Sequence, residues 1–449
     1  MIIVIIMFVD RVEELKSLQK KLKSDKFELI IVYGRRRIGK TRLILEAIKN
    51  IEHVYYLAVE GNNLKYFKEA ASNIAPEIRY VQEDWEIYFR FLKDKVIVID
   101  EFPNLIKENR HIVSIFQRIV DNQLKNTKTK IILCGSSISM MSEKVLSYRS
   151  PLYGRRTASL KLQPLKFKDI KGFFPNVGIK DLIEIYGFAD GIPYYLEKIE
   201  MPFWKWLRNE LESPDSFLKD EMDFVIKYEF EDVSTYKKIL EAIAMGNTTL
   251  KEIKDYLGMK HSDITPYLRN LMLTEFIKRE VPITENWRSK KGRYFIKDNF
   301  TAFWFRYIFP NLSAIEEGIF DVDRIRKDYS LYLGRIFENV VKEVLIIQSK
   351  SNTLPFKITK IGKWWHKDKE IDLVALNENS GDIMFVEIKW KDNVNAEKIL
   401  HKLKEKAKYV RWKNNDRKEH FAIFAKSFRK KINEYCFDLK DLERMINKV

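Results

Sequence analysis

The fold of this chain is decided by the stretch Val32-Tyr-Gly-Arg-Arg-Arg-Ile-Gly-Lys-Thr41. Gly34 and Gly39 enclose four residues and precede Lys40 and Thr41, which is the spacing of a phosphate-binding loop. Glycines let backbone N–H groups turn toward a phosphate, and the helix that begins here adds the positive end of its dipole. We expect Lys40 to reach the β- and γ-phosphates of a nucleotide and the Thr41 hydroxyl to bind Mg²⁺.

The segments on either side have the context that such a loop requires. Phe27 to Val32 is mostly apolar and β-branched, which predicts a buried strand, and Arg42 to Ile48 has helical spacing. The alternative is a basic turn before an ordinary helix. We expect the nucleotide to be bound by consecutive residues of the loop and the helix start, which are Gly34, Arg35, Arg36, Arg37, Ile38, Gly39, Lys40, Thr41 and Arg42.

A pair of carboxylates follows a predicted central strand. Val96 to Ile99 is a run of β-branched residues, typical of a parallel strand that is buried on both faces, and Asp100 and Glu101 come next. Asp100 would help to hold Mg²⁺ at the carboxyl edge of the sheet. Glu101 would polarise the attacking water as a general base. A surface acidic turn is the alternative interpretation.

Two further segments supply candidate phosphate contacts. Lys130 to Ser137 predicts another buried strand, next to the acidic one, and it ends in Gly-Ser-Ser. Ser136 or Ser137 could contact the γ-phosphate or the water, although this tripeptide is also ordinary turn chemistry. Arg155 and Arg156 lie on a short loop, where they could stabilise the transferring phosphoryl group or contact nucleic acid.

These motifs resemble those of the archaeal AAA+-related ATPases, within the wider STAND class of signalling NTPases. The matching segments are Phe-Val-Asp-Arg (8–11), Tyr-Gly-Arg-Arg-Arg-Ile-Gly-Lys-Thr (33–41), Ile-Asp-Glu-Phe (99–102), Cys-Gly-Ser-Ser (134–137), Pro-Leu-Tyr-Gly-Arg-Arg-Thr (151–157) and Gly-Ile-Pro (191–193). The resemblance implies that Pro193 packs near the adenine of ATP. It also implies that Ser136 or Ser137 is the sensor and that the Arg155–Arg156 pair takes part in phosphate sensing.

The middle of the chain predicts a winged helix-turn-helix. Its expected elements are helices at 236–244, 250–257 and 262–276 and strands at 277–283 and 293–296. Thr249 and Glu252 form a capping box at the start of the second helix. Such a domain can place its third helix in a DNA groove, but it can also serve only as a packing module. The aromatic segment from Phe300 to Pro310 is predicted to be a buried helix between domains.

The C-terminal region carries charged residues on strands that are otherwise apolar. Asp372 interrupts one predicted strand, and Glu387 and Lys389, which share one face, interrupt the next. Such charges are costly to bury without a purpose. Asp372 and Glu387 would hold Mg²⁺ through oxygen ligands, and Glu338 on the preceding helix would complete the shell through a water. Lys389 would position or activate the attacking water.

This constellation is similar to the PD-(D/E)xK nuclease superfamily, and the archaeal ATPase family often carries such a domain. The resemblance implies Mg²⁺-dependent hydrolysis of phosphodiesters. The alternatives are a salt-bridged strand pair and a nuclease fold retained only for binding. The lysine-rich helix predicted from Ala396 to Trp412 would flank the site and hold the DNA backbone.

Composition narrows the classes of partner. The formal net charge is +17, and the segment 391–435 has 14 Lys and Arg against 6 Asp and Glu. This distribution favours a polyanion such as DNA, although a lysine-rich solvated face or an acidic membrane surface would also fit. The apolar run at residues 1–9 is shorter than the roughly 20 residues that span a bilayer. With only Cys134 and Cys436 as cysteines, we expect a cytoplasmic protein with no membrane partner.

The sequence therefore predicts an α/β fold in several parts. The expected segments are a P-loop ATPase core with a parallel sheet (8–165), an AAA+-like helical lid (166–231), a winged helix-turn-helix (232–300), a connecting helix (301–328) and an α/β restriction-endonuclease-like domain (329–449). We expect ATP hydrolysis with Mg²⁺, coupled to DNA binding or cleavage. The alternatives are a STAND-type nucleotide switch and a DNA-binding regulator, both without nuclease activity. The oligomeric state stays open, and a homo-oligomer is among the alternatives.

Overall fold

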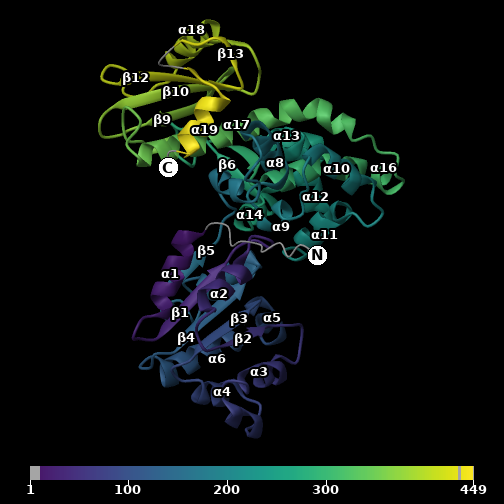
Figure 1. Cartoon of the computed structure of the whole chain (residues 1–449), viewed down its shortest axis with the longest axis vertical. Coiled ribbons are helices and arrows are strands. Elements are labelled where there is room, and N and C mark those ends of the chain that lie inside the picture. The colour runs from purple at the N-terminus through teal and green to yellow at the C-terminus, as the bar shows by residue number, and fades with distance from the viewer. Residues whose placement is uncertain (1–10, 433–435, 448–449) are drawn as a thin grey trace. The chain divides into compact units, whose positions relative to one another are not determined.

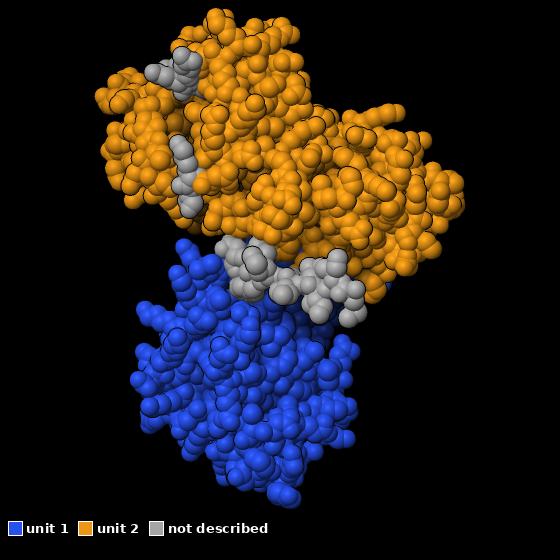
Figure 2. All heavy atoms as spheres, viewed as in Figure 1, with its two compact units in different colours: residues 1–165, 192–195, 225–231 blue, residues 166–191, 196–224, 232–449 orange. Residues whose placement is uncertain are grey.

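The chain divides into two compact units (Figure 2). The computed structural model describes residues 11–432 and 436–447, so residues 8–10 of the predicted Phe-Val-Asp-Arg motif lie outside the described part. Unit 1 contains the described residues up to Leu165, together with 192–195 and 225–231, and unit 2 contains the other described residues. The chain thus returns to unit 1 twice, for a few residues each time. No helix in the described part is long and apolar enough to cross a membrane.

Unit 1 is built on a five-stranded parallel sheet in the order β2-β3-β4-β1-β5 (Figure 1). Its strands are β1 (Glu28–Tyr33), β2 (His53–Leu57), β3 (Val96–Asp100), β4 (Lys130–Gly135) and β5 (Ala158–Lys161). β3 and β4 are buried along their whole length, as their apolar runs predicted. Because the strands are parallel, the carboxyl ends of β3, β4 and β1 lie side by side at one edge.

Helices pack on both faces of this sheet. They include α1 (Val12–Leu22), α2 (Lys40–Ile48), α3 (Asn63–Ala71), α4 (Trp85–Phe91), α5 (Phe102–Glu108) and α6 (Ile112–Ile119). Alternate residues of β1 enter different cores: Ile30 and Val32 pack with α1 and α2, whereas Leu29 and Ile31 pack with α3 to α6. This is the predicted α/β P-loop NTPase architecture.

β5 pairs in parallel with β1 from Ala158 to Lys161. The Thr157 N–H donates to the Leu29 carbonyl, so pairing with β1 begins before Leu160. Pro164 has no N–H with which to extend the ladder.

Unit 2 contains a helical region with an aromatic core. Its longer helices are α8 (Ile179–Ala189), α10 (Phe203–Glu212), α12 (Val233–Ala244), α13 (Leu250–Tyr256), α14 (Thr265–Leu273) and α17 (Asp323–Lys350), with α15 (Asn299–Phe303) and α16 (Leu312–Glu316) between the last two. Phe300 and Phe303 are almost fully buried, and the ring of Phe303 lies 4.9 Å from that of Phe188. The prediction that this aromatic segment is buried is confirmed. Two short helices, α9 (Pro193–Leu196) and α11 (Glu221–Lys227), cross from one unit to the other.

The elements predicted for the winged helix are present in the expected order. The capping box forms, because the Thr249 side chain accepts from the Glu252 N–H and the Glu252 side chain accepts from the Thr249 N–H. The hairpin of β6 (Ile277–Glu280) and β7 (Arg293–Ile296) follows α14. β6 ends earlier than predicted, since the chain beyond it turns to the C-terminal sheet, where the Ile283 N–H donates to the Lys363 carbonyl at 2.8 Å.

The C-terminal part of unit 2 is a mixed sheet in the order β14-β12-β10-β9-β8 (Figure 1). Its strands are β8 (Lys360–His366), β9 (Lys369–Leu376), β10 (Asp382–Lys389), β12 (Lys418–Ala425) and β14 (Cys436–Phe437). β8, β9 and β10 form an antiparallel meander, and β12 runs parallel to β10. The remaining elements are β11 (Val394–Asn395), α18 (Ala396–Ala407), β13 (Phe428–Lys430) and α19 (Leu439–Asn447).

Candidate functional site

The predicted phosphate loop connects β1 to α2 in unit 1. Gly34 has φ +148°, and a Cβ there would lie 2.6 Å from the Leu162 carbonyl oxygen, so no other residue fits. Gly39 has φ +84° and directly precedes α2, which begins at Lys40. Both glycines are therefore required by the backbone, as the motif implied. The N–H groups in the first turn of a helix have no acceptor within the helix, and the positive end of the α2 dipole lies at this loop.

Lys40 is buried at the base of this loop. Its side chain is 5% exposed, and its ammonium donates to the Arg35 carbonyl at 2.8 Å. Burial lowers the pKa of Lys40, while the nearby carboxylates of Glu101 and Asp100 oppose that shift. A cation kept in a buried position next to an N–H-lined loop favours an anionic ligand.

Asp100 joins the loop to the end of β3. Its Oδ2 accepts from the Thr41 hydroxyl at 2.6 Å and from the Tyr55 hydroxyl at 3.0 Å. Its Oδ1 accepts from the Glu101 N–H at 2.9 Å. Burial and the Asp100 charge raise the pKa of Tyr55, so this hydroxyl stays a donor. The sequence analysis did not identify Tyr55. The only feature that could have indicated it is its position on β2, the strand beside β3.

Glu101 lies next to Asp100 in a left-handed conformation with φ +52°. Its carboxylate accepts from the Ser136 hydroxyl at 2.5 Å through Oε1 and from the Tyr228 hydroxyl at 2.7 Å through Oε2. The structure therefore brings together Glu101 and Ser136, the sensor candidate. Tyr228 was missed, because it lies 127 residues from Glu101 in the sequence and no motif marks it.

The neighbouring side chains of the loop contact the two short segments that return to unit 1. The Arg37 guanidinium stacks on the Tyr194 ring at 3.7 Å, and the Tyr194 N–H donates to the Arg37 carbonyl at 3.4 Å. Pro193, predicted to lie near the adenine, is close enough to the loop that a Cβ on Gly39 would be 3.8 Å from its ring. The Arg36 guanidinium lies 4.2 Å from the Tyr228 ring centre.

Arg11, the one described residue of the Phe-Val-Asp-Arg motif, supports the loop from behind. It is 5% exposed, and its guanidinium donates to the carbonyls of Ile38 at 2.8 Å and Gln163 at 2.9 Å. Ile38 is buried beneath the loop, whereas Arg35 and Arg42 are partly exposed on either side of it.

The structure does not bring Arg155 and Arg156 to the loop. They precede β5, beside the amino end of β1, where the Thr157 N–H donates to the Leu29 carbonyl. The phosphate loop follows the opposite end of β1, roughly 13 Å away along the strand. Arg155 is bound instead to Asp121 through Nε at 3.0 Å and Nη2 at 2.8 Å.

In unit 2, three of the predicted C-terminal residues meet on β9 and β10. The Lys389 ammonium lies 3.0 Å from Asp372 Oδ2 and 2.9 Å from Glu387 Oε1. Lys406 of α18 donates to both oxygens of Glu387, at 3.0 and 3.1 Å. The predicted basic helix thus reaches the cluster, and its last helical residue is Ala407.

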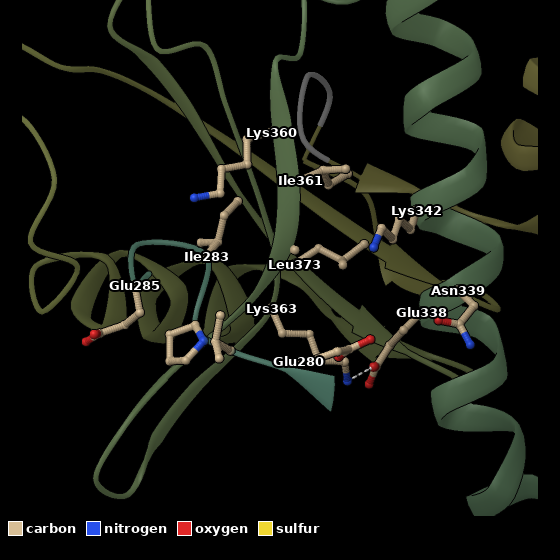
Figure 3. Close-up of a pocket in the computed structure, with 13 residues that line it drawn as sticks. Glu280, Ile283, Glu285, Glu338, Asn339, Lys342, Lys360, Ile361, Lys363 and Leu373 are labelled. Carbon is tan, nitrogen blue, oxygen red and sulfur yellow. Dashed lines mark hydrogen bonds and ion pairs between the residues drawn. The ribbon is translucent and has the colours of Figure 1, made fainter. Parts of the chain in front are cut away.

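Glu338 lines a pocket between α17, β8 and the chain after β6 (Figure 3). The pocket has a cavity of about 180 Å³, and Glu338 forms an ion pair with Lys363 of β8 at its wall (Figure 3). Burial raises the pKa of Glu338 to about 7; Lys363 opposes the shift and Asp372 adds to it. Among residues 11–432 and 436–447, no group of three or more His, Cys, Asp or Glu is arranged to hold a metal ion.

The parallel sheet, the loop and the acidic pair define a P-loop ATPase. Residues 8–199 match the family described as an ATPase domain predominantly from Archaea. Residues 304–399 match a second family, described as Archaea bacterial proteins of unknown function. An uncharacterized protein of Methanocaldococcus jannaschii is 62% identical over 439 residues, which cover 97% of this chain and 100% of that protein. The chain belongs to the same family as this relative, and its residues 8–199 form an archaeal ATPase domain, which implies nucleotide binding.

Two further matches are shorter or more distant. An uncharacterized ATP-binding protein of Methanocaldococcus jannaschii is 54% identical over 46 residues, covering 10% of this chain and 78% of that protein. The structure of a Walker-type ATPase of Pyrococcus abyssi has a TM-score of 0.52 and 21% identity, covering 66% of this chain and 96% of that one. The second likeness shows the shared fold.

Proposed function

We propose that the protein hydrolyses ATP with Mg²⁺ at the phosphate loop and that this cycle controls DNA binding or cleavage by its C-terminal region. The observation that carries the ATPase part is the 2.6 Å contact between Thr41 Oγ1 and Asp100 Oδ2. Both atoms are hard oxygen donors of the kind that Mg²⁺ prefers, so the pair fits this cation. When bound, Mg²⁺ would neutralise charge on the β- and γ-phosphates.

The other residues of the site have distinct roles in this proposal. Lys40 contacts the β- and γ-phosphates, and Glu101 orients and deprotonates the attacking water. Ser136 is placed to contact the γ-phosphate, and Pro193 lies against the adenine. The loop N–H groups from Gly34 onward bind the phosphate oxygens.

The DNA part of the proposal rests on the cluster of β9 and β10. Asp372 and Glu387 offer neighbouring carboxylates, which fit a divalent cation, and Lys389 lies between them and is one-third exposed. If Lys389 turns outward, it can contact the attacking water or the scissile phosphate while the carboxylates take the metal. Lys406 and the exposed lysines of α18 would bind the backbone phosphates. We assign this role to the predicted segment 329–449, with 8–165 as the ATPase core.

The main alternative is a nucleotide switch that binds DNA without cutting it. It is favoured by the lysine partners of Asp372, Glu387 and Glu338, which neutralise all three carboxylates. A regulator that reads DNA through the winged helix is the second alternative. Its hairpin packs on the C-terminal sheet, which leaves α14 as the element to test for base contacts.

One experiment separates these functions. Plasmid and branched DNA are incubated with the full chain and Mg²⁺ or Mn²⁺, with and without ATP, while phosphate release is recorded. Lys40→Ala should reduce ATP turnover by about 10²–10³-fold, since it removes a preorganised charge at the phosphates. Glu387→Gln should abolish cleavage but leave turnover intact. Lys49→Ala, at the exposed residue that follows α2, and Glu405→Gln, at an exposed residue of α18, are the matched controls.

The outcomes distinguish the proposals. Turnover that survives in Lys40→Ala would contradict the phosphate-loop assignment. DNA that is bound but never cut by the wild type would replace the nuclease with the switch.

A further inference from the structure

The second short segment of unit 1, residues 225–231, contacts the candidate ATPase site although the chain on both sides of it lies in unit 2. It contains the end of α11 and the pair Tyr228–Glu229. None of the predicted site residues lies in this segment. Its contacts are with the candidate base, the loop and the end of β4.

Tyr228 is bound to the base and to the loop at once. Its hydroxyl donates to Glu101 Oε2 at 2.7 Å, while Glu101 Oε1 accepts from Ser136 at 2.5 Å. On its ring face, the Arg36 guanidinium lies at 4.2 Å and the Lys107 ammonium at 5.3 Å. Each oxygen of the Glu101 carboxylate therefore already accepts a hydroxyl hydrogen bond, and one of these comes from outside the sheet.

Glu229 fixes the segment beside β4. Its carboxylate accepts from the Ile138 N–H at 2.9 Å, from the Ser139 hydroxyl at 2.8 Å and from the Ser137 hydroxyl at 3.2 Å. Burial raises the pKa of Glu229, and these donors oppose the shift. These contacts of Glu229 keep the neighbouring Tyr228 close to Glu101 and Ser136.

We propose that Tyr228 is a latch on the catalytic base, a positioning residue that withholds Glu101 from the attacking water until the latch opens. This inference rests on the proposed role of Glu101. A general base needs a carboxylate oxygen that faces the water, and Tyr228 turns Oε2 toward its own hydroxyl. Opening requires only that this hydrogen bond breaks, and no covalent step is involved.

The contacts of Tyr228 also indicate what would break its hydrogen bond to Glu101. Phosphate groups in the loop attract the Arg36 guanidinium, and Arg36 then leaves the Tyr228 ring, which loses its cation–π contact. The chain enters unit 2 at both ends of this segment.

The test is steady-state ATP turnover by Tyr228→Phe, which keeps the ring on Arg36 and removes only the hydroxyl. We expect kcat to rise about 3- to 10-fold, the range for one hydrogen bond, with KM for ATP unchanged. Tyr88→Phe is the matched control, because the buried Tyr88 hydroxyl has no hydrogen-bond partner in the described part of the chain. Glu229→Gln, which weakens the anchor, should raise kcat in the same direction and serves as the second variant.

The results separate this inference from the ATPase proposal. If Glu101→Gln does not reduce turnover, the proposed role of Glu101 is wrong. If Glu101→Gln abolishes turnover but Tyr228→Phe lowers kcat or leaves it unchanged, the proposed role of Tyr228 is wrong. The proposed role of Glu101 then still holds. A rise in kcat accompanied by a changed KM would assign Tyr228 to nucleotide binding instead.

Discussion

Arg155, which the sequence suggested as a phosphate contact, is hydrogen-bonded to Asp121. The two-point contact raises the pKa of Arg155 and lowers that of Asp121, in both cases mainly through the hydrogen bonds between them. The pair lies at the amino edge of the parallel sheet, away from the phosphate loop. Any action of Arg155 on a phosphate would have to be on the nucleotide of another chain.

Arg155→Ala should leave ATP turnover by the isolated chain unchanged and lower its stability by about 0.2–1 kcal/mol, the range for an exposed ion pair. Because the folded-state pKa of Asp121 is depressed, the pair stabilises the fold above the unfolded-state pKa of about 3.9. This contribution disappears as the pH falls through the folded-state pKa. Urea unfolding at pH 7 and in strong acid measures the difference.

Asp121→Asn is the control, since it should lower the free energy of unfolding by the same amount and leave ATP turnover unchanged. A loss of kcat in Arg155→Ala alone would indicate an action in trans. Mixing that variant with Lys40→Ala chains would then restore turnover.

At the scale of elements, the hairpin of β6 and β7 is bound to the C-terminal sheet of unit 2. Arg293 of β7 stacks on the Trp365 ring at 4.7 Å and pairs with Glu370 at 3.1 Å. The Trp365 indole N–H donates to the Lys291 carbonyl at 3.2 Å. Strand β8 lies at the edge of its sheet, and these contacts cover it with the chain between β6 and β7.

Arg293→Ala should therefore destabilise unit 2 by about 0.5–2 kcal/mol, through the loss of a cation–π contact and an ion pair. Equilibrium unfolding followed by tryptophan fluorescence reports this change, because Trp365 is one of the partners. Lys290→Ala removes an exposed charge from the same connection and should change stability by less than about 0.5 kcal/mol. If the two substitutions lower the free energy of unfolding equally, the contacts of Arg293 with the sheet do not stabilise unit 2.

At the scale of the whole molecule, the net charge of +17 is the largest single feature that favours DNA. Nearly half of the excess lies in residues 391–435, which include α18. Long-range attraction of this kind depends on salt, because binding releases counterions from the DNA.

DNA affinity should fall linearly with the logarithm of salt concentration, by about 10³-fold or more between 50 and 200 mM if six or more phosphates are contacted. Replacing the exposed Lys398 and Lys402 of α18 with alanine should reduce the slope by about two. Lys16→Ala with Lys20→Ala on α1 removes the same charge from unit 1 and should leave the slope unchanged. Fluorescence anisotropy of labelled duplex DNA across a salt series measures both slopes.

The sequence by itself determined the local elements and the loop. The order of strand, Gly34, Gly39 and helix predicted a P-loop, because those glycines have backbone angles that other residues rarely adopt. The β-branched run before Asp100 predicted a strand buried on both faces, since periodicity reports burial directly. The capping box at Thr249 was also readable from two residues three positions apart.

Only the tertiary structure decided which distant residues meet. The Tyr228–Glu101 contact joins positions 127 apart. Arg155, predicted from its place on a short loop to contact phosphate, pairs with Asp121. Likewise, the cluster of Asp372, Glu387 and Lys389 depends on the register of β9 with β10. Sequence patterns record the environment of each residue along its own element, whereas the partner of a side chain is set by how separate elements pack, which no local pattern encodes.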